Sequence, residues 1–157
     1  MARMRGPDRV RAALEAASLK CEIRTLPDST RTAVEAAAAV GCSVGEIAKS
    51  LVFRARDRAV VAIMSGDNQL DPARLAAAVG EDVGRADADF VRATTGFAIG
   101  GVPPLGHATP VDVFMDEDLF RFDEIWAAAG SPYSVFAVAP ARLREASGAM
   151  VMELRAD

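Results

Sequence analysis

Lys49 is the first residue to consider for chemistry, because the chain has only two lysines beside sixteen arginines. It lies in the apolar stretch Ile47–Phe53, and an ammonium group is costly to remove from water without an anionic partner. One interpretation is that the lysine stem lies along the core surface while the charged end reaches water. The other is that Lys49 binds an anionic ligand, and its compact charge suits a phosphate group.

A second stretch that could take part in chemistry is the loop Gly100–Gly106, which precedes the single histidine, His107. Glycines let backbone N–H groups approach a ligand, and Pro103 and Pro104 stiffen the loop. Such a loop can stabilise an oxyanion or hold a water molecule without a side chain. It can equally be a rigid connection between elements. His107 is then either a general base or a hydrogen-bonding strut.

The other common catalytic motifs are missing from the sequence. A single histidine excludes a two-histidine metal site, and Cys21 and Cys42 do not have metal-type spacing. There is no phosphate-binding loop, no dinucleotide-binding glycine motif and no serine nucleophile elbow. We therefore expect no metal and no cofactor, and we expect both cysteines to be reduced thiols of a cytoplasmic protein.

Capping signals and apolar runs predict the elements that position these residues. The pairs Thr32/Glu35 and Ser43/Glu46 have the spacing of capping boxes. With capping aspartates and terminal glycines, they predict helices at 8–18, 32–41, 43–49, 71–80, 87–94, 123–130 and 140–147. Strands are predicted at 21–26, 51–55, 59–65, near 83, and at 111–115, 134–138 and 150–154. Lys49 would thus lie where a short helix meets a strand, and Asp116–Asp118 would form a solvated turn and the start of a helix.

The length and composition fit one domain over residues 1–157, with ordinary globular proportions of hydrophobic and charged residues. Irregular alternation of helices and strands, with at least one hairpin, predicts a mixed α/β fold with a mixed sheet. No apolar run approaches the roughly 18 residues that span a bilayer, and residues 1–7 lead into no signal core. The net charge of −4 argues against a broad footprint on duplex DNA, but it allows a small pocket for one or two phosphates.

Several motifs follow one another in a definite order along the chain. They are Thr32–Ala37, Ile47–Phe53, Met64–Asp71, Thr95–His107, Val113–Asp116 and Ala128–Gly130. In order and spacing, from about Asp8 to Leu154, the chain resembles the YbaK and prolyl-tRNA-synthetase-associated editing domain family. The resemblance implies a single-domain, mixed-sheet pseudo-barrel surrounded by helices.

The same resemblance implies a trans-acting deacylase that hydrolyses the ester of mischarged tRNA. The expected substrate is tRNA(Pro) carrying a small non-cognate residue such as Ala, Cys, Ser or Thr. By resemblance, Lys49 binds the phosphate of the terminal nucleotide, and the loop residues Gly100, Gly101 and Pro104 surround the aminoacyl carbonyl. The other candidate substrate-binding residues are Thr32, Ser65, Thr95, Phe97 and His107. Further candidates for pocket walls are Val52, Met64, Thr94 and Ser131.

Two other functions stay open at this point. The same lysine could serve a non-catalytic module that binds a nucleotide or an RNA 3′ end. A small-molecule carboxylic-ester hydrolase is a third candidate, although no activated serine or cysteine is visible. For the deacylase, the expected partners are the acceptor end of mischarged tRNA and either prolyl-tRNA synthetase or another translation factor, with the protein itself a monomer.

Overall fold

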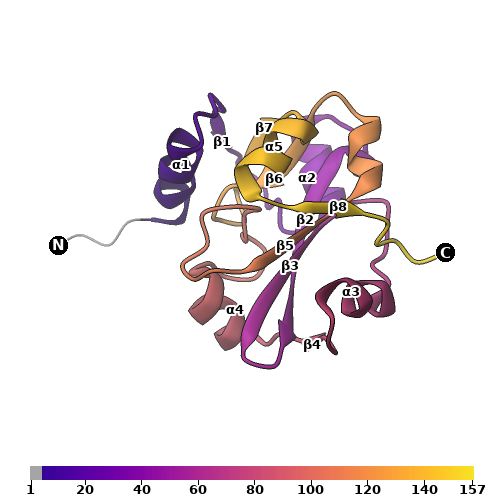
Figure 1. Ribbon diagram of the computed structural model, residues 1–157. Helices are drawn as coiled ribbons and strands as arrows, with labels where there is room; N and C mark the ends of the chain where they lie inside the picture. The colour runs from indigo at the N-terminus through magenta and orange to yellow at the C-terminus, as the bar shows by residue number, and fades with distance from the viewer. Residues whose placement is uncertain (1–4) are drawn as a thin grey trace.

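A computed structural model describes residues 5–157 as a mixed α/β fold built on an eight-stranded sheet (Figure 1). The helices are α1 (Gly6–Ala16), α2 (Ala33–Val40), α3 (Pro72–Val79), α4 (Ala88–Thr95) and α5 (Pro140–Ser147), with 3-10 turns η1 (Val44–Glu46) and η2 (Glu117–Arg121). The strands are β1 (Ile23–Thr25), β2 (Ile47–Ala55), β3 (Arg58–Ser65), β4 (Gly84–Arg85), β5 (Asp112–Asp116), β6 (Ile125–Ala128), β7 (Ser134–Val138) and β8 (Met150–Met152). The predicted fold class is confirmed.

The sheet has the order β1-β7-β6-β2-β3-β5-β8, and β4 pairs with β2 outside this path. The central β2–β3 hairpin is antiparallel, as are β6–β7 and β1–β7. The pairs β2–β6, β3–β5 and β5–β8 are parallel, so the sheet is mixed. Within the described range, no helix is long and apolar enough to cross a bilayer. The expectation about an export signal rests mainly on residues 1–4, which lie outside the described residues.

Strand β3 is buried on both faces, which explains its nearly continuous apolar sequence. Val61 and Ile63 pack into the larger core cluster with residues of α1, α4 and α5. Met64 faces the opposite way and packs with Leu75 of α3 and Leu154 of the carboxyl-terminal segment. A strand covered on both faces loses the apolar–polar alternation of a half-exposed strand.

The predicted helix at 123–130 is wrong, because this segment forms strand β6. Ile125 and Ala127 are fully buried while Trp126 is half-exposed, which is the two-residue alternation of a strand. Pairing with β2 on one side and β7 on the other overrides the helical preference of the three alanines that follow Trp126. Gly130, the predicted helix end, instead begins the turn from β6 to β7.

Two further predictions need correction at helix ends. The segment 43–49 is not a helix that ends at Lys49, because η1 stops at Glu46 and Lys49 is the third residue of β2. The Ser43/Glu46 capping box is nevertheless present. Helix α1 begins at Gly6 rather than after Asp8, so Asp8 lies in its first turn and pairs with Arg11 at 3.0 Å.

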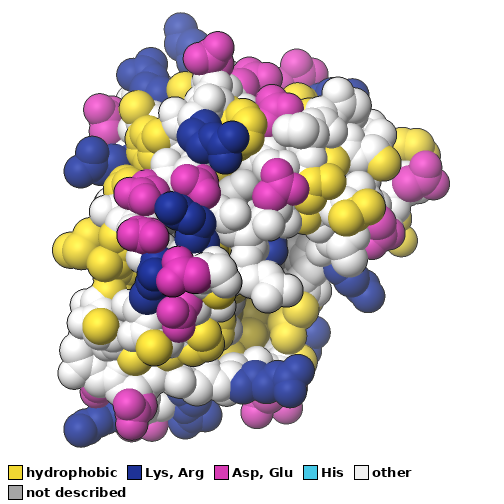
Figure 2. All heavy atoms as spheres, turned by 90° about the vertical axis from the view of Figure 1, so that its right-hand side faces the viewer, with side chains coloured by type: hydrophobic (Ala, Val, Ile, Leu, Met, Phe, Trp, Pro, Cys, Tyr) yellow, Lys and Arg dark blue, Asp and Glu magenta, His cyan; other side chains and the backbone are white. Residues whose placement is uncertain are grey.

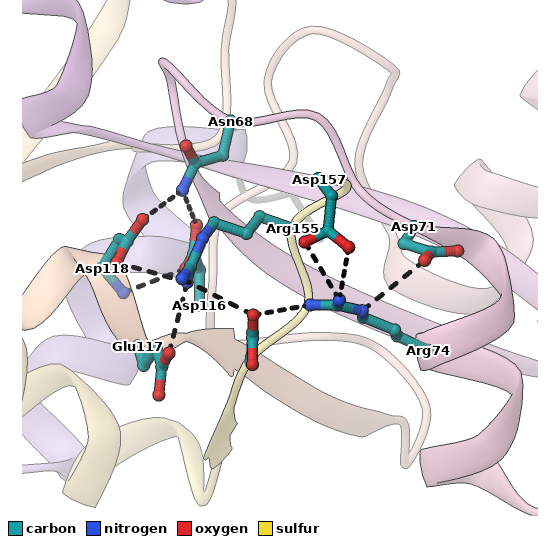
Figure 3. A network of polar contacts seen from close by, with 9 residues as sticks. Asn68, Asp71, Arg74, Asp116, Glu117, Asp118, Arg155 and Asp157 are labelled. Atoms are coloured by element: carbon teal, nitrogen blue, oxygen red, sulfur yellow. Dashed lines mark hydrogen bonds and ion pairs between the residues drawn. The ribbon is translucent and has the colours of Figure 1, made fainter.

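The acidic triplet does start a helix, because Asp116 caps η2, but it is not a solvated turn, because Asp116 is fully buried at the end of β5. Its carboxylate accepts hydrogen bonds from the Asn68 side-chain amide (2.8 Å) and the Asp118 backbone N–H (2.9 Å) (Figure 3). It also accepts a hydrogen bond from the Ser65 backbone N–H (3.1 Å). These bonds join the end of β3, the turn that follows it and the start of η2. Asp116 is therefore a structural link between elements distant in sequence.

Ion pairs extend this network to the carboxyl terminus. Arg155 contacts Glu117 and Asp118, and Arg74 of α3 contacts Glu153 at 2.8 Å and Asp157 at 3.2 Å (Figure 3). Acidic and basic side chains accordingly interleave on the face that carries α3 and the carboxyl terminus (Figure 2). Exposed pairs of this kind contribute little individually, so we assign the main stabilising role in this region to buried Asp116.

We predict that Asp116→Ala lowers the free energy of unfolding by about 3 kcal/mol, because it leaves several buried donors without an acceptor. The matched control is Asp123→Ala, which removes an exposed carboxylate and should change stability by less than about 0.5 kcal/mol. Urea denaturation followed by circular dichroism measures both. Equal stability of the two variants would contradict the role given to Asp116.

Candidate functional site

The site begins with a gap in the pairing of β2. One edge of this strand pairs with β3 along almost its whole length. The other edge pairs with β6 only at Ile47 and Ala48 and with β4 only at Phe53 and Arg54. Within the described residues, the segment Lys49–Val52 therefore has no strand partner on this outer edge.

Two residues of this segment, Ser50 and Val52, direct their backbone groups toward the outer edge of β2. The Gly66 N–H donates to the Ile47 carbonyl at 2.8 Å, so the backbone of Ile47 points toward the β3 side. Because backbone groups of successive residues point to alternate edges, the N–H and C=O of Ser50 and Val52 point into the gap. Neither residue has a register partner in β6 or β4.

A pocket of about 380 Å³ opens at one end of this gap. It lies between β2, helix α2, strand β6 and the loop that begins at Ile99. Its walls are mostly apolar and many of its side chains are small. The lining residues are Thr30–Ala33, Ala36, Ile47–Leu51, Ile99, Gly100, Val102, Trp126–Ala128 and Val135. The volume falls within the range of small-molecule sites.

Lys49 brings a positive charge to this otherwise apolar pocket. Burial lowers the pKa of Lys49, and the negative charges of Asp116 and then Asp67 partly offset the shift by raising it. The side chain is half-buried, and no described carboxylate lies within ion-pair distance of it. An incompletely compensated ammonium group in a pocket is suited to an anionic ligand.

The glycine–proline loop forms the wall opposite β2, and two close contacts explain its glycines. Gly100 has φ +96°, and a Cβ there would lie 2.9 Å from Cγ of Arg31. A Cβ on Gly101 would lie 2.8 Å from Cα of Ser131. The Gly101 N–H donates to the Ala98 carbonyl at 3.1 Å, whereas the Gly100 N–H bonds to no other described residue. Gly100 therefore holds the donor that is available to a ligand.

The structure brings only some of the predicted site residues to the pocket. Lys49, Thr32 and Gly100 line it, and the Thr32 hydroxyl also caps α2 by accepting from the Glu35 N–H at 3.1 Å. Gly101 and Pro104 are buried behind the lining and shape the loop.

The other predicted residues lie in the core or on its border, with their polar groups already bonded. The Ser65 hydroxyl donates to the Gly45 carbonyl at 2.7 Å, and the Thr95 hydroxyl donates to the Val91 carbonyl at 2.6 Å. Phe97 is buried, with the Arg9 guanidinium 4.6 Å from its ring centroid. His107 is half-buried and bonds the Pro103 carbonyl through Nε2 at 2.8 Å. Burial lowers the pKa of His107, so the ring is neutral near pH 7 and fits the strut role.

Most of the predicted wall residues also lie in the core or on its border, with their polar groups already bonded. Met64 is fully buried in the second core cluster. The Thr94 hydroxyl donates to the Phe90 carbonyl at 2.7 Å, and the Ser131 hydroxyl donates to that of Ser134 at 2.8 Å. Val52 lies on the free strand segment, beside the pocket.

Sequence reasoning missed several residues that line the pocket. Trp126 was placed on a helix, yet from β6 it lines the pocket, with the Arg24 guanidinium 5.4 Å from its ring centroid. Ser50 was not considered, although its hydroxyl is buried and has no hydrogen-bond partner among the described residues. The sequence signal that could have identified Ser50 is that it is an isolated serine within an apolar strand. No sequence pattern near Arg31 identifies it as a pocket residue, because it contacts Gly100 only in the folded chain.

Comparison with known proteins agrees with this geometry. Residues 27–146 match the aminoacyl-tRNA editing domain family. The uncharacterised protein YwhH of Bacillus subtilis (strain 168) is 32% identical over 127 residues, covering 80% of this chain and 81% of that protein. A proline–tRNA ligase of Thermoanaerobacter sp. (strain X514) is 29% identical over 94 residues, which cover 58% of this chain but only 16% of the ligase.

A solved structure is similar over nearly the entire chain. It belongs to a protein proposed as a trans-editing enzyme for prolyl-tRNA synthetase, with 43% identity and a TM-score of 0.93. The match covers 99% of this chain and 100% of that one. A mixed-sheet α/β fold with a lysine-containing apolar pocket thus coincides with an editing-domain sequence. The chain belongs to the aminoacyl-tRNA editing domain family.

We predict that Lys49 titrates below the ordinary range of a lysine, and that a bound phosphate monoester raises its pKa. Because the folded-state pKa is the lower one, Lys49 costs stability at neutral pH, and this cost disappears as pH rises through that pKa toward the unfolded value. NMR titration of the lysine side-chain resonances measures the pKa, and Lys49→Ala assigns the signal. In Asp116→Asn the pKa should fall further, since a raising charge is lost. An unchanged Lys49 pKa in that variant would contradict the electrostatic account.

Proposed function

We propose that this chain is a trans-acting deacylase that hydrolyses the ester of mischarged tRNA. The observation that carries the proposal is the half-buried Lys49 in a pocket whose opposite wall is the Gly100 loop. The lysine would bind the phosphate of the terminal nucleotide, and the ester would lie between Lys49 and the loop. Membership of the editing-domain family supports the reaction class.

Hydrolysis at this site would depend on positioning rather than on an ionised nucleophile. The Gly100 N–H would stabilise the developing oxyanion, while Gly101 and Pro104 hold the loop in place. A water molecule fixed beside the ester carbonyl gains the rate advantage of an oriented reactant. Each of these roles uses a backbone group or loop shape, which agrees with the absence of a nucleophile elbow in the sequence.

The pocket walls support a small aminoacyl group. Alanine side chains from α2 and β6 line the pocket, namely Ala33, Ala36, Ala127 and Ala128. We propose tRNA(Pro) carrying Ala, Cys, Ser or Thr as the substrate, by analogy with the related structure and ligase. A small pocket discriminates mainly by excluding larger residues, at about 1–3 kcal/mol per methylene.

We further propose that the protein acts as a single-domain monomer in the cytoplasm and contacts mainly the acceptor end of the tRNA. The net charge of −4 supports a limited contact with phosphates. Prolyl-tRNA synthetase is the candidate partner that would supply the remaining recognition.

The test is deacylation of tRNA(Pro) charged with Ala, Cys, Ser, Thr or Pro. We expect release of one small non-cognate residue, with kcat/KM about 10- to 100-fold lower in Lys49→Ala, since a charged hydrogen bond contributes about 1.5–3 kcal/mol. Lys20→Ala is the matched control, because Lys20 is exposed and is the only other lysine.

Two outcomes would contradict the proposal in different ways. Binding without turnover of any charged tRNA would favour the non-catalytic 3′-end binding module. Turnover that Lys49→Ala leaves unchanged would keep the activity but remove Lys49 from the site.

A further inference from the structure

Helix α1 lies outside residues 27–146, the part of the chain that matches the editing-domain family, and it stands at one side of the molecule (Figure 1). Its residues Val10 and Leu14 are buried in the larger core cluster. Apolar packing therefore explains why α1 is docked on the rest of the fold. It does not explain a polar contact by which Arg9 reaches the start of the segment that carries Gly100.

The Arg9 side chain holds the start of this segment in two ways. Its guanidinium donates to the Gly96 carbonyl at 2.6 Å. The same group lies 4.6 Å from the ring centroid of Phe97, within the range of a cation–π interaction. Arg9 is half-buried, and no carboxylate of residues 5–157 lies within ion-pair distance of it. Because a partly desolvated charge needs polar partners, these two contacts are what keeps the guanidinium in place.

Close packing shows that α1 fits against both ends of the loop. Gly96 ends α4 with φ +83°, and a Cβ there would collide with the guanidinium of Arg9. At the other end of the loop, a Cβ on Gly106 would lie 3.0 Å from the Cβ of Ala13. Helix α1 therefore contacts the chain both before and after Gly100.

A third contact joins α1 to the turn that lies behind the loop. Gly6, the first residue of α1, approaches Gly130 so closely that a Cβ on Gly6 would collide with the Gly130 carbonyl oxygen. The next residue, Ser131, lies behind Gly101, where a Cβ would be 2.8 Å from the Ser131 Cα. One helix thus contacts both ends of the loop and the turn that supports its middle.

We propose that Arg9 is a positioning residue that holds the Gly100 N–H in the orientation that stabilises the oxyanion. It acts through its contacts with Gly96 and Phe97, because it does not itself line the pocket. This inference rests on the proposed function, since it takes the Gly100 N–H as the donor to the ester. A backbone donor lowers the barrier only if it is already aimed at the developing charge. Misplacement of a reacting group by about 1 Å can cost about 100-fold in rate.

The first experiment measures deacylation of charged tRNA(Pro) by Arg9 variants. In Arg9→Ala we expect kcat about 10-fold lower and KM within about twofold of wild type, because Lys49 and the pocket walls still bind the substrate. Arg9→Lys keeps the charge but loses the planar group that stacks on Phe97, so its kcat should be about threefold below wild type. Arg11→Ala removes an exposed arginine of the same helix and is the matched control, with wild-type kcat.

Hydrogen exchange of backbone amides separates positioning of the loop from a general loss of stability. The Gly101 N–H bonds the Ala98 carbonyl at 3.1 Å, so its exchange reports the order of the loop. In Arg9→Ala it should exchange about tenfold faster, while the Val61 N–H of strand β3 keeps its wild-type rate. Equal acceleration at both amides would show that Arg9 serves overall stability only, and the proposal would be overturned.

The two measurements together distinguish this proposal from the proposed function. Hydrolysis by the wild type with an unchanged kcat in folded Arg9→Ala, or with a change in KM alone, would overturn the positioning role while leaving the deacylase intact. If the wild type hydrolyses no charged tRNA, the deacylase is overturned, and exchange alone then tests Arg9. Acceleration confined to the loop would support its restraint by Arg9, and wild-type exchange at Gly101 would overturn it.

Discussion

The pocket depends on the incomplete pairing of β2. Strands β6 and β4 pair with the two ends of its outer edge, and no strand of the described chain pairs with the segment Lys49–Val52 between them. Side chains alternate across a strand, and this segment therefore directs Lys49 to one face and Ser50 to the other. In an ordinary central strand, the backbone groups of this segment would bond to a neighbouring strand on the outer edge. That neighbour would fill the concavity beside β2.

Burying the Lys49 ammonium group costs free energy, and nearby carboxylates reduce this cost. Burial disfavours the ammonium form, and the buried carboxylate of Asp116 opposes that effect. The same carboxylate ties the end of β3 to η2. The stability of the sheet and the protonation of Lys49 thus depend on one residue, Asp116. This coupling follows from the register, which places Lys49 opposite Met64, the neighbour of Ser65.

The sequence predicted best what local chemistry determines. The caps formed by Thr32 and Asp71 were predicted correctly, and Asp87 is one of the two capping aspartates, with Asp89, that the sequence offered. In each case a side chain bonds a backbone N–H within three residues. Lys49 stood out through its rarity, and the structure places it in the pocket. The strand that contains Trp126 and the burial of Asp116 were missed, because each depends on a partner distant in sequence, Ile47 for Trp126 and Ser65 for Asp116. Neither leaves a short-range pattern that differs from a helix or a solvated turn.

The distance in sequence between β2 and β6 also bears on how the chain folds. The lysine-bearing strand pairs with residues near Trp126, and β1 pairs with β7 beyond residue 133. Such non-local pairings form slowly, because a long loop must close before any contact stabilises it. The β2–β3 hairpin can form early during synthesis on the ribosome, but the pocket wall that β6 forms cannot. The pocket is therefore complete only when almost the whole chain has emerged.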